Sequence, residues 1–581
     1  MDATTGGKRL NYLRGERANE RTTLDQTKPF RQRDSRLGDI VNSDPQYVDS
    51  KKDFGYSHLS GTYLTFRNAI LAAATPRPPM VVVGANDGML HGFRADLDSN
   101  GGTELFAYVP NGVYDNLFKL TLPIYEHQYY VDGTVRISDA YSTSWPTTST
   151  TGTNWRTIVV GTTGAGGESV FALDITDPMN MTNAKVLWEF SPPEMGYTLF
   201  QPEIVALPGS SPPYFGVIVT SGYEAPGPDG RIWILEPATG NILHCFKVKG
   251  SLNLGSPFGA DVNGDWLAER IYVGDADGKL WRFDIPDITG PGSTTCTPDS
   301  GVTPPALLDS GDAIPLFVDT VTAATISNMS TPTPNPYPYN RPITAAPVAE
   351  FNTSGDVMVF FGTGSFYKIN DNQVPAVPPI DTFYGIIDRG SQIVGRGTLQ
   401  EQEILAQVSA YGKNVRAVTQ NVTNCATKDG WYLDLVWKTT YGGNGPVGER
   451  VVSRAIVRDD RAIFATLIPS TDPCAYGGTS FIMELGMYCG NRLDYSVFDI
   501  KPDNKLDDQD KITVNGVLVP VSGFDPGVGI IKTPAIVDLP YNPDPLVPTQ
   551  VKIYSGSSAS LGGMFEKSPL GVGRQSWEQL R

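Results

Sequence analysis

Oxygen-bearing side chains recur at short intervals in the segment DVNGDWLAE, residues 261–269. Asp261, Asn263, Asp265 and Glu269 stand at relative positions 1, 3, 5 and 9, and the carbonyl of Leu267 at position 7 adds a backbone oxygen. Ca²⁺ takes roughly six to eight oxygen ligands at about 2.3–2.6 Å, and water molecules can complete the shell. The spacing therefore predicts a calcium site built from these five residues.

The loop departs from an ordinary EF-hand in three places. Gly264 is at position 4, Trp266 stands at position 6 where the EF-hand has glycine, and Tyr272 replaces the bidentate Glu at position 12. Asp, Asn and Gly also form turns in many β proteins, so a metal-free turn is the alternative interpretation. A structural zinc site is excluded because the loop contains neither Cys nor His.

A second acidic segment, DIKPDNKLDDQD, covers residues 499–510. Asp499, Asp503, Asp507 and Asp510 fall at positions 1, 5, 9 and 12, which is an EF-hand-like or dockerin-like spacing. Lys501 at position 3 would bring an ammonium group towards the cation. A second metal site and an exposed acidic turn both remain open, and we favour the turn.

The elements that must position these loops are predicted to be short strands. The chain has 581 residues with 61 Gly and 46 Pro, and only 18% of its residues are charged, which favours many strands joined by tight turns over long exposed helices. One pattern recurs seven times: an apolar run, a glycine-rich turn and a second strand. The copies cover residues 80–95, 157–175, 216–240, 270–285, 357–388, 461–485 and 551–566.

A β unit repeated four to eight times is typical of a β-propeller. We predict an all-β fold, a modified seven-bladed propeller over residues 36–581, with long inter-blade insertions near 142–155 and in the Pro/Thr-rich stretch 286–345. Residues 1–35 form a lead-in that either contains a short helix within 10–26 or, as we favour, is solvated. Closing the ring requires a partner for the last blade, and we expect the strand at 36–48 to supply it together with GRQSWEQLR at the end of the chain.

Charge and cysteine content limit the function further. The net charge of −17 argues against general nucleic-acid binding and suits an extracellular or periplasmic protein that meets divalent cations. No run of 18 apolar residues predicts a transmembrane segment, and the basic start lacks the apolar core of a signal peptide. Of the five cysteines at least one is unpaired, and Cys474 with Cys489 is the best candidate for a disulfide.

Catalytic patterns are weak, and no catalytic residue is assigned. The four histidines are scattered, and His91 in GMLHGF is predicted to be a packed strand residue. No GxSxG, Walker A or dinucleotide-binding motif occurs in a convincing setting. Glycine-rich turns are shared with propeller quinoproteins, so a quinone-dependent dehydrogenase is an alternative, although such enzymes typically have adjacent cysteines that this chain lacks.

Several phrases occur together in one order: RLGDIVNSDPQYV, VVVGANDGMLHGF, DVNGDWLAE followed by GKLWRFD, and SWEQL near the end. In these phrases the sequence, from about residue 8 onwards, resembles the C-terminal domain of the PilY family, the type IV pilus tip-associated adhesins. The resemblance implies a modified seven-bladed propeller whose calcium ligands are Asp261, Asn263, Asp265, Leu267 and Glu269. The family often has Asp at position 9, so Glu269 is a departure that is one methylene longer.

The resemblance also implies a function. Members are large secreted proteins whose N-terminal half is missing here, and some carry an Arg-Gly-Asp tripeptide linked to integrin binding. The tripeptide here is Arg14-Gly15-Glu16, and we do not transfer that activity, because integrin recognition needs the shorter carboxylate.

The implied role is that of a calcium-dependent biogenesis factor and adhesin that opposes pilus retraction when Ca²⁺ is bound and supports twitching motility, attachment and virulence. Its partners would be pilins or minor pilins and a host or abiotic surface, at the cell surface after transit through the periplasm. The alternatives are the quinone-dependent enzyme above and a calcium-independent scaffold for envelope assembly.

Overall fold

The structure of the chain is a computed structural model. It describes residues 3–72, 77–146, 151–251, 253–290, 308–309, 312–319, 341–368, 370–376, 378–423, 425–540, 544 and 546–567. The chain divides into two compact units, Met1–Ile271 with Phe283–Pro305, and Tyr272–Arg282 with Ala306–Arg581. The described α-helices are α1 (Ala3–Leu13) and α2 (Gly61–Ala72), and among the described helices none is long and apolar enough to cross a membrane.

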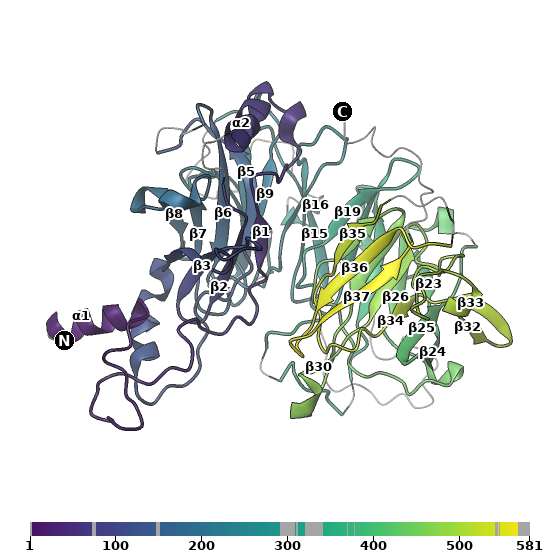
Figure 1. The fold of residues 1–581 in the computed structure, drawn as a ribbon. Helices are drawn as coiled ribbons and strands as arrows, with labels where there is room; N and C mark the ends of the chain where they lie inside the picture. The colour runs from purple at the N-terminus through teal and green to yellow at the C-terminus, as the bar shows by residue number, and fades with distance from the viewer. Residues whose placement is uncertain are drawn as a thin grey trace. The chain divides into compact units, whose positions relative to one another are not determined.

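Three four-stranded antiparallel sheets, drawn in purple to teal in Figure 1, make up most of the first unit. In each of them the strands follow the order of the chain. The first contains β1 (Gln46–Val48), β2 (Met80–Ala85), β3 (Met89–Arg94) and β4 (Glu104–Tyr108). The second contains β5 (Arg136–Tyr141), β6 (Trp155–Thr162), β7 (Val170–Asp174) and β8 (Val186–Phe190). The third contains β9 (Glu203–Ala206), β10 (Phe215–Thr220), β11 (Asp229–Leu235) and β12 (Ile242–Lys249).

The fourth sheet carries the predicted calcium loop. Its strands, in order across the sheet, are β13 (Phe258–Ala260), β14 (Arg270–Gly274), β15 (Lys279–Asp284), β18 (Phe317–Val318) and β22 (Ile393–Val394). Its last two strands, β18 and β22, run parallel to each other.

The remaining sheets belong to the second unit. The fifth has the order β19 (Val348–Phe351), β20 (Val357–Gly362), β21 (Thr382–Asp388), β26 (Gly430–Asp434) and β23 (Gln400–Gln402). The sixth has the order β24 (Ile404–Ala410), β25 (Lys413–Val418), β34 (Gly523–Phe524), β31 (Ile482–Gly486), β28 (Arg461–Ala465) and β27 (Ile456–Arg458). The seventh contains β35 (Ala535–Asp538), β36 (Gln550–Ser555) and β37 (Leu561–Glu566).

Smaller elements join these sheets. Two-stranded ribbons are formed by β16 (Leu308–Asp309) with β17 (Asp312–Ala313), β29 (Ile468–Pro469) with β30 (Gly478–Thr479), and β32 (Lys511–Val514) with β33 (Val517–Pro520). Short 3₁₀ helices are η1 (Tyr56–His58), η2 (Asn111–Thr121), η3 (Pro178–Asn180), η4 (Asn183–Lys185), η6 (Cys425–Thr427), η7 (Thr439–Tyr441), η8 (Pro473–Ala475) and η9 (Asp508–Asp510).

The seven predicted hairpins fall in seven different sheets. They are β2–β3, β6–β7, β10–β11, β14–β15, β20–β21, β28–β31 and β36–β37. Several of these strands are buried along their whole length, as in β6, where every residue is buried, whereas β36 and β37 alternate buried with exposed residues. The prediction of an all-β, modified seven-bladed β-propeller is confirmed.

Neighbouring sheets within each unit bury their faces against one another. In the first unit, Trp155 of the second sheet packs on Phe215 of the third with ring centroids 5.2 Å apart, and Phe66 of α2 belongs to the same core. In the second unit, Phe383 of the fifth sheet stacks on Phe464 of the sixth at 3.8 Å. Aromatic pairs add to the apolar burial that holds the sheets together.

The predicted partner of the last sheet is wrong. The strand in segment 36–48 is only β1, and it pairs with β2, so that Tyr47 lies opposite Val81. Val48 of β1 is buried in the core shared by the first two sheets, which fixes the strand there. The terminal GRQSWEQLR and most of the Pro/Thr-rich insertion lie outside the described residues.

A few buried side chains anchor the N-terminal segment, while most of residues 5–35 are exposed or half-buried. Helix α1 ends at Leu13, before Gly15 takes a left-handed conformation with φ of +98°. Tyr12 and Phe30 are both buried with ring centroids 5.1 Å apart, and the guanidinium of Arg33 lies 3.7 Å from the Tyr12 ring. The domain boundary at residue 35 stays a prediction.

The disulfide prediction is also wrong. Cys489 is bonded to Cys425, whose Cα lies 5.7 Å away, and Cys474 is free and exposed. Cys474 sits in the surface helix η8, where its backbone N–H donates to the cap residue Asp472. Cys245 is disulfide-bonded as well.

The sixth and seventh sheets are joined by a fully buried ion cluster. The ammonium of Lys552 contacts the carboxylates of both Glu484 and Glu566, and Arg461 donates to Glu484 at 2.7 Å. All four side chains have no exposed surface. Burial and the neighbouring Glu484 carboxylate raise the pKa of Glu566 to about 8.

We predict that Lys552→Met lowers the free energy of unfolding by about 3–5 kcal/mol, because it leaves the buried side chains of Glu484 and Glu566 without their shared cation. Lys505→Met, on an exposed turn, is the control and should change stability by less than about 0.5 kcal/mol. Urea unfolding of the three proteins measures the difference. A loss below about 1 kcal/mol for Lys552→Met would show that the cluster contributes little.

Candidate metal centre

Residues 261–269 form the loop between β13 and β14 of the fourth sheet. Backbone hydrogen bonds hold its C-terminal end. The N–H of Ala268 donates to the carbonyl of Ala206 at 2.8 Å, and the N–H of Glu269 donates to the carbonyl of Ala260 at 3.0 Å. Because strands flank the loop on both sides, its two ends are fixed independently of any ligand.

Backbone N–H groups inside the loop orient its carboxylates. Asp261 accepts from Gly264 at 2.6 Å and from Trp266 at 2.7 Å, and Asp265 accepts from Leu267 at 2.9 Å. Gly264 and Trp266 have left-handed backbone conformations, with φ of +84° and +70°. These two residues turn the chain around the Asp261 side chain.

Three carboxylates converge at the centre of the loop. Oxygens of Asp261, Asp265 and Glu269 all lie within 4.8 Å of one another. Burial, followed by the charges of Asp265 and Asp261, raises the pKa of Glu269 to about 7. Repulsion among like charges this close makes the ionised state of Glu269 unfavourable.

Asn263 completes the group. Its Nδ2 lies 3.2 Å from Oδ2 of Asp265 and 3.3 Å from Oε1 of Glu269. A half-turn of the side-chain amide would exchange Nδ2 for Oδ1 and present an oxygen to the same point. The half-turn would give up the bond that Oδ1 accepts from the Asp265 N–H at 2.9 Å. The resulting all-oxygen set would fit a hard cation such as Ca²⁺.

The structure therefore brings together four of the five predicted ligands. The side chain of Leu267 packs against the core of the second and third sheets, and the role of its carbonyl stays a prediction. The sequence did not indicate that the ring of Trp266 would meet His58, with ring centroids 4.6 Å apart. The sequence feature that could have indicated a contact of residue 266 is a large aromatic side chain at the position where an EF-hand has glycine.

The second acidic loop has a different geometry. Asp499 and Asp510 accept hydrogen bonds from backbone N–H groups of their own loop. Asp507 caps η9, and Lys501 pairs with Asp503 at 3.1 Å. Within the part of the chain that the structure describes, its carboxylates form no three-ligand group like that at 261–269. The acidic-turn interpretation is favoured.

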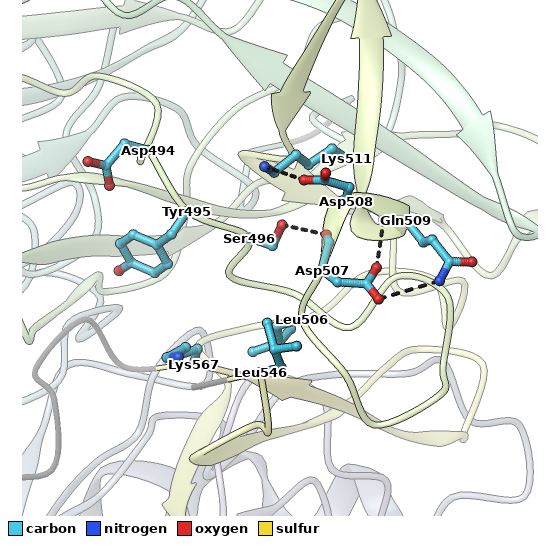
Figure 2. A pocket seen from close by; sticks show the side chains of 10 residues that line it. All are labelled: Asp494, Tyr495, Ser496, Leu506, Asp507, Asp508, Gln509, Lys511, Leu546 and Lys567. Atoms are coloured by element: carbon cyan, nitrogen blue, oxygen red, sulfur yellow. Dashed lines mark hydrogen bonds and ion pairs between the residues drawn. The ribbon is translucent and has the colours of Figure 1, made fainter. Parts of the chain in front are cut away.

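A pocket of about 890 Å³ lies beside this second loop, and Figure 2 shows the side chains that line it. It is lined by Asp494, Tyr495, Ser496, Leu506, Asp507, Asp508, Gln509, Lys511, Leu546 and Lys567. Many of its polar groups bond to each other: Asp508 pairs with Lys511 at 2.7 Å, and Asp507 accepts from the Gln509 backbone at 2.7 Å. The pocket thus offers fewer polar groups to a ligand than its composition suggests.

Two further sequence features can be placed. His91 is a packed residue of β3, as predicted, with Nδ1 2.6 Å from Glu104 and Nε2 3.1 Å from Asp87. Arg14-Gly15-Glu16 follows α1, and the residues on either side of Gly15 are exposed.

Comparison with known proteins identifies relatives over most of the chain. The family model described as the PilY1 beta-propeller domain matches residues 37–411. The type IV pilus biogenesis factor PilY1 of Pseudomonas aeruginosa strain PAK is 32% identical over 561 residues, covering 90% of this chain and 44% of that protein. A PilY1 homolog of Xylella fastidiosa is 33% identical over 516 residues, covering 84% of this chain and 32% of that protein.

A solved structure agrees with the fold. The crystal structure of the C-terminal domain of Pseudomonas aeruginosa PilY1 superimposes with a TM-score of 0.66 at 26% identity, covering 90% of this chain and 99% of that one. The chain spans only about a third to under half of the length of the full relatives named above.

We predict that Glu269→Gln stabilises the metal-free chain at pH 8 by about 1 kcal/mol, because it removes one of three repelling carboxylates. Because the pKa of Glu269 is raised from 4.5 to about 7 in the folded chain, its ionisation costs stability progressively as the pH rises between these two values, so the two proteins should have similar stability at pH 4. Thermal unfolding in EDTA measures the effect. Exposed Glu194→Gln is the control, and an equal gain there would remove the electrostatic explanation.

Selectivity gives a second prediction. Mg²⁺ prefers a compact octahedral shell at about 2.0–2.1 Å and retains its waters, which an extended loop of protein oxygens matches poorly. Millimolar Mg²⁺ should therefore displace Ca²⁺ only weakly in a competition titration. Displacement at comparable concentrations would mean that the loop closes more tightly than its geometry indicates.

Proposed function

We propose that this chain, which belongs to the PilY1 family of type IV pilus biogenesis factors, acts in pilus biogenesis. In this proposal its action is controlled by Ca²⁺ bound at 261–269. The observation that carries the calcium dependence is the convergence of Asp261, Asp265 and Glu269. Ca²⁺, when bound, would supply the positive charge that these oxygens lack. The role is one of binding and regulation rather than catalysis.

The residues of the loop suit a switch. Without a cation, the carboxylates repel one another and their spacing is set by the backbone N–H groups that they accept from. With a cation, the same oxygens and the turned amide of Asn263 would be drawn towards one point. A ligand that favours one of two loop arrangements shifts their populations by its difference in affinity.

We further propose the biological consequences of this switch. In the calcium-bound state the protein opposes pilus retraction, and loss of calcium permits retraction. Twitching motility and attachment then depend on alternation between these two states. The partners are pilins or minor pilins and, at the pilus tip, a host or abiotic surface. In this proposal the protein acts at the cell surface after passage through the periplasm.

Two substitutions at Asp265 should distinguish the calcium-free from the calcium-bound state of the loop in cells that carry the full-length protein. Asp265→Ala removes a ligand and imitates the empty loop, so surface pili should be lost because retraction is unopposed. Asp265→Lys places an ammonium near the other carboxylates and partly imitates occupancy, so pili should remain while twitching stops. Surface pili and twitching zones are the measurements.

Deleting the retraction motor is the control, because it should restore pili to the Asp265→Ala strain. If both variants behaved alike, or if pili stayed absent without the motor, the loop would be a structural support and the switch would be refuted.

A further inference from the structure

Trp266 connects the metal loop to a separate surface segment. Its ring lies against His58 of η1, with ring centroids 4.6 Å apart. Gly55, the residue before η1, also faces this ring: a Cβ at Gly55 would lie 3.7 Å from Cζ3 of Trp266. The contact therefore involves two residues of the 53–72 segment, which contains η1 and α2.

The backbone of Trp266 is tied to a predicted ligand. Its N–H donates to Oδ2 of Asp261 at 2.7 Å. Movement of the Asp261 carboxylate towards a cation would thus act directly on residue 266. One residue joins the carboxylate cluster, through its backbone, to His58, through its ring.

The identity of this residue supports a role for the ring. Trp266 has a φ of +70°, a left-handed conformation that is unfavourable for a bulky residue and available to glycine at no steric cost. The side chain is 54% exposed, so burial in the core does not account for it. What tryptophan offers here and glycine lacks is the contact with His58.

Hydrogen bonds connect the parts of the 53–72 segment to one another. The carboxylate of Asp53 accepts from the N–H of Gly55 at 2.8 Å and from the hydroxyl of Tyr63 at 3.1 Å, which links η1 to α2. The Tyr63 hydroxyl also lies 2.9 Å from Asp139 of β5. These hydrogen bonds connect Gly55, which faces the Trp266 ring, to Tyr63 of α2 through the Asp53 carboxylate.

We propose that Trp266 is a positioning residue through which occupancy of the metal loop is transmitted to residues 53–63. This inference rests on the proposed calcium binding. Coupling is reciprocal, so the contact that orders residues 53–63 in the calcium-bound state also strengthens calcium binding. The 261–269 loop and the 53–63 segment then form one calcium-responsive surface.

Hydrogen exchange of the purified chain in CaCl₂ and in EGTA tests the proposal, with calorimetry on the same samples. In the wild type, calcium should slow exchange both at 261–269 and at 53–63. In His58→Ala, protection at 261–269 should persist, protection at 53–63 should be lost, and the Kd for calcium should rise about fivefold or more. His58→Phe keeps a ring in place and should restore both properties.

Tyr114→Ala, which removes a comparably exposed ring from η2, is the matched control and should behave as the wild type. If calorimetry showed that the wild type binds calcium, but calcium slowed exchange only at 261–269, the coupling would be overturned and the calcium site would stand. If calcium gave no heat of binding and did not slow hydrogen exchange, the calcium site itself would be refuted, and the coupling with it.

Discussion

A β-hairpin whose strands are apolar on both faces cannot be stable alone, because each face must be covered by another layer. This constraint governs the chain. Strands such as β6 and β10 are buried along their whole length, and the sheets of each unit solve the problem by packing on their neighbours. The loops between strands are less constrained by the core than the strands are, and binding chemistry is usually found in such loops.

The candidate metal loop at 261–269 depends on this arrangement. The hydrogen bond from Glu269 to Ala260 closes the loop at its base, and the packing of Leu267 into the apolar core anchors its far side. The sheet therefore keeps the loop folded although its three carboxylates repel one another. An electrostatically unfavourable cluster on a stable framework is what a cation-dependent switch requires.

Features encoded by neighbouring residues could be predicted from the sequence. An apolar run followed by a glycine-rich turn is a local signal, so all seven hairpins were located, and the spacing of Asp261, Asp265 and Glu269 indicated their convergence. Features set by tertiary distance could not be predicted. The partner of Cys489 depends on which Cα lies 5.7 Å away, and β1 is too short to reveal its pairing with β2. The meeting of Trp266 with His58 joins segments that are distant in sequence.

The most direct test of the calcium site is the anomalous diffraction signal from crystals of this chain grown with CaCl₂. We expect one Ca²⁺ at 261–269, with oxygens of Asp261, Asp265 and Glu269 and the carbonyl of Leu267 at about 2.3–2.6 Å. Absence of an ion from this loop at millimolar calcium, or an ion bound at Asp499–Asp510 in its place, would contradict the account.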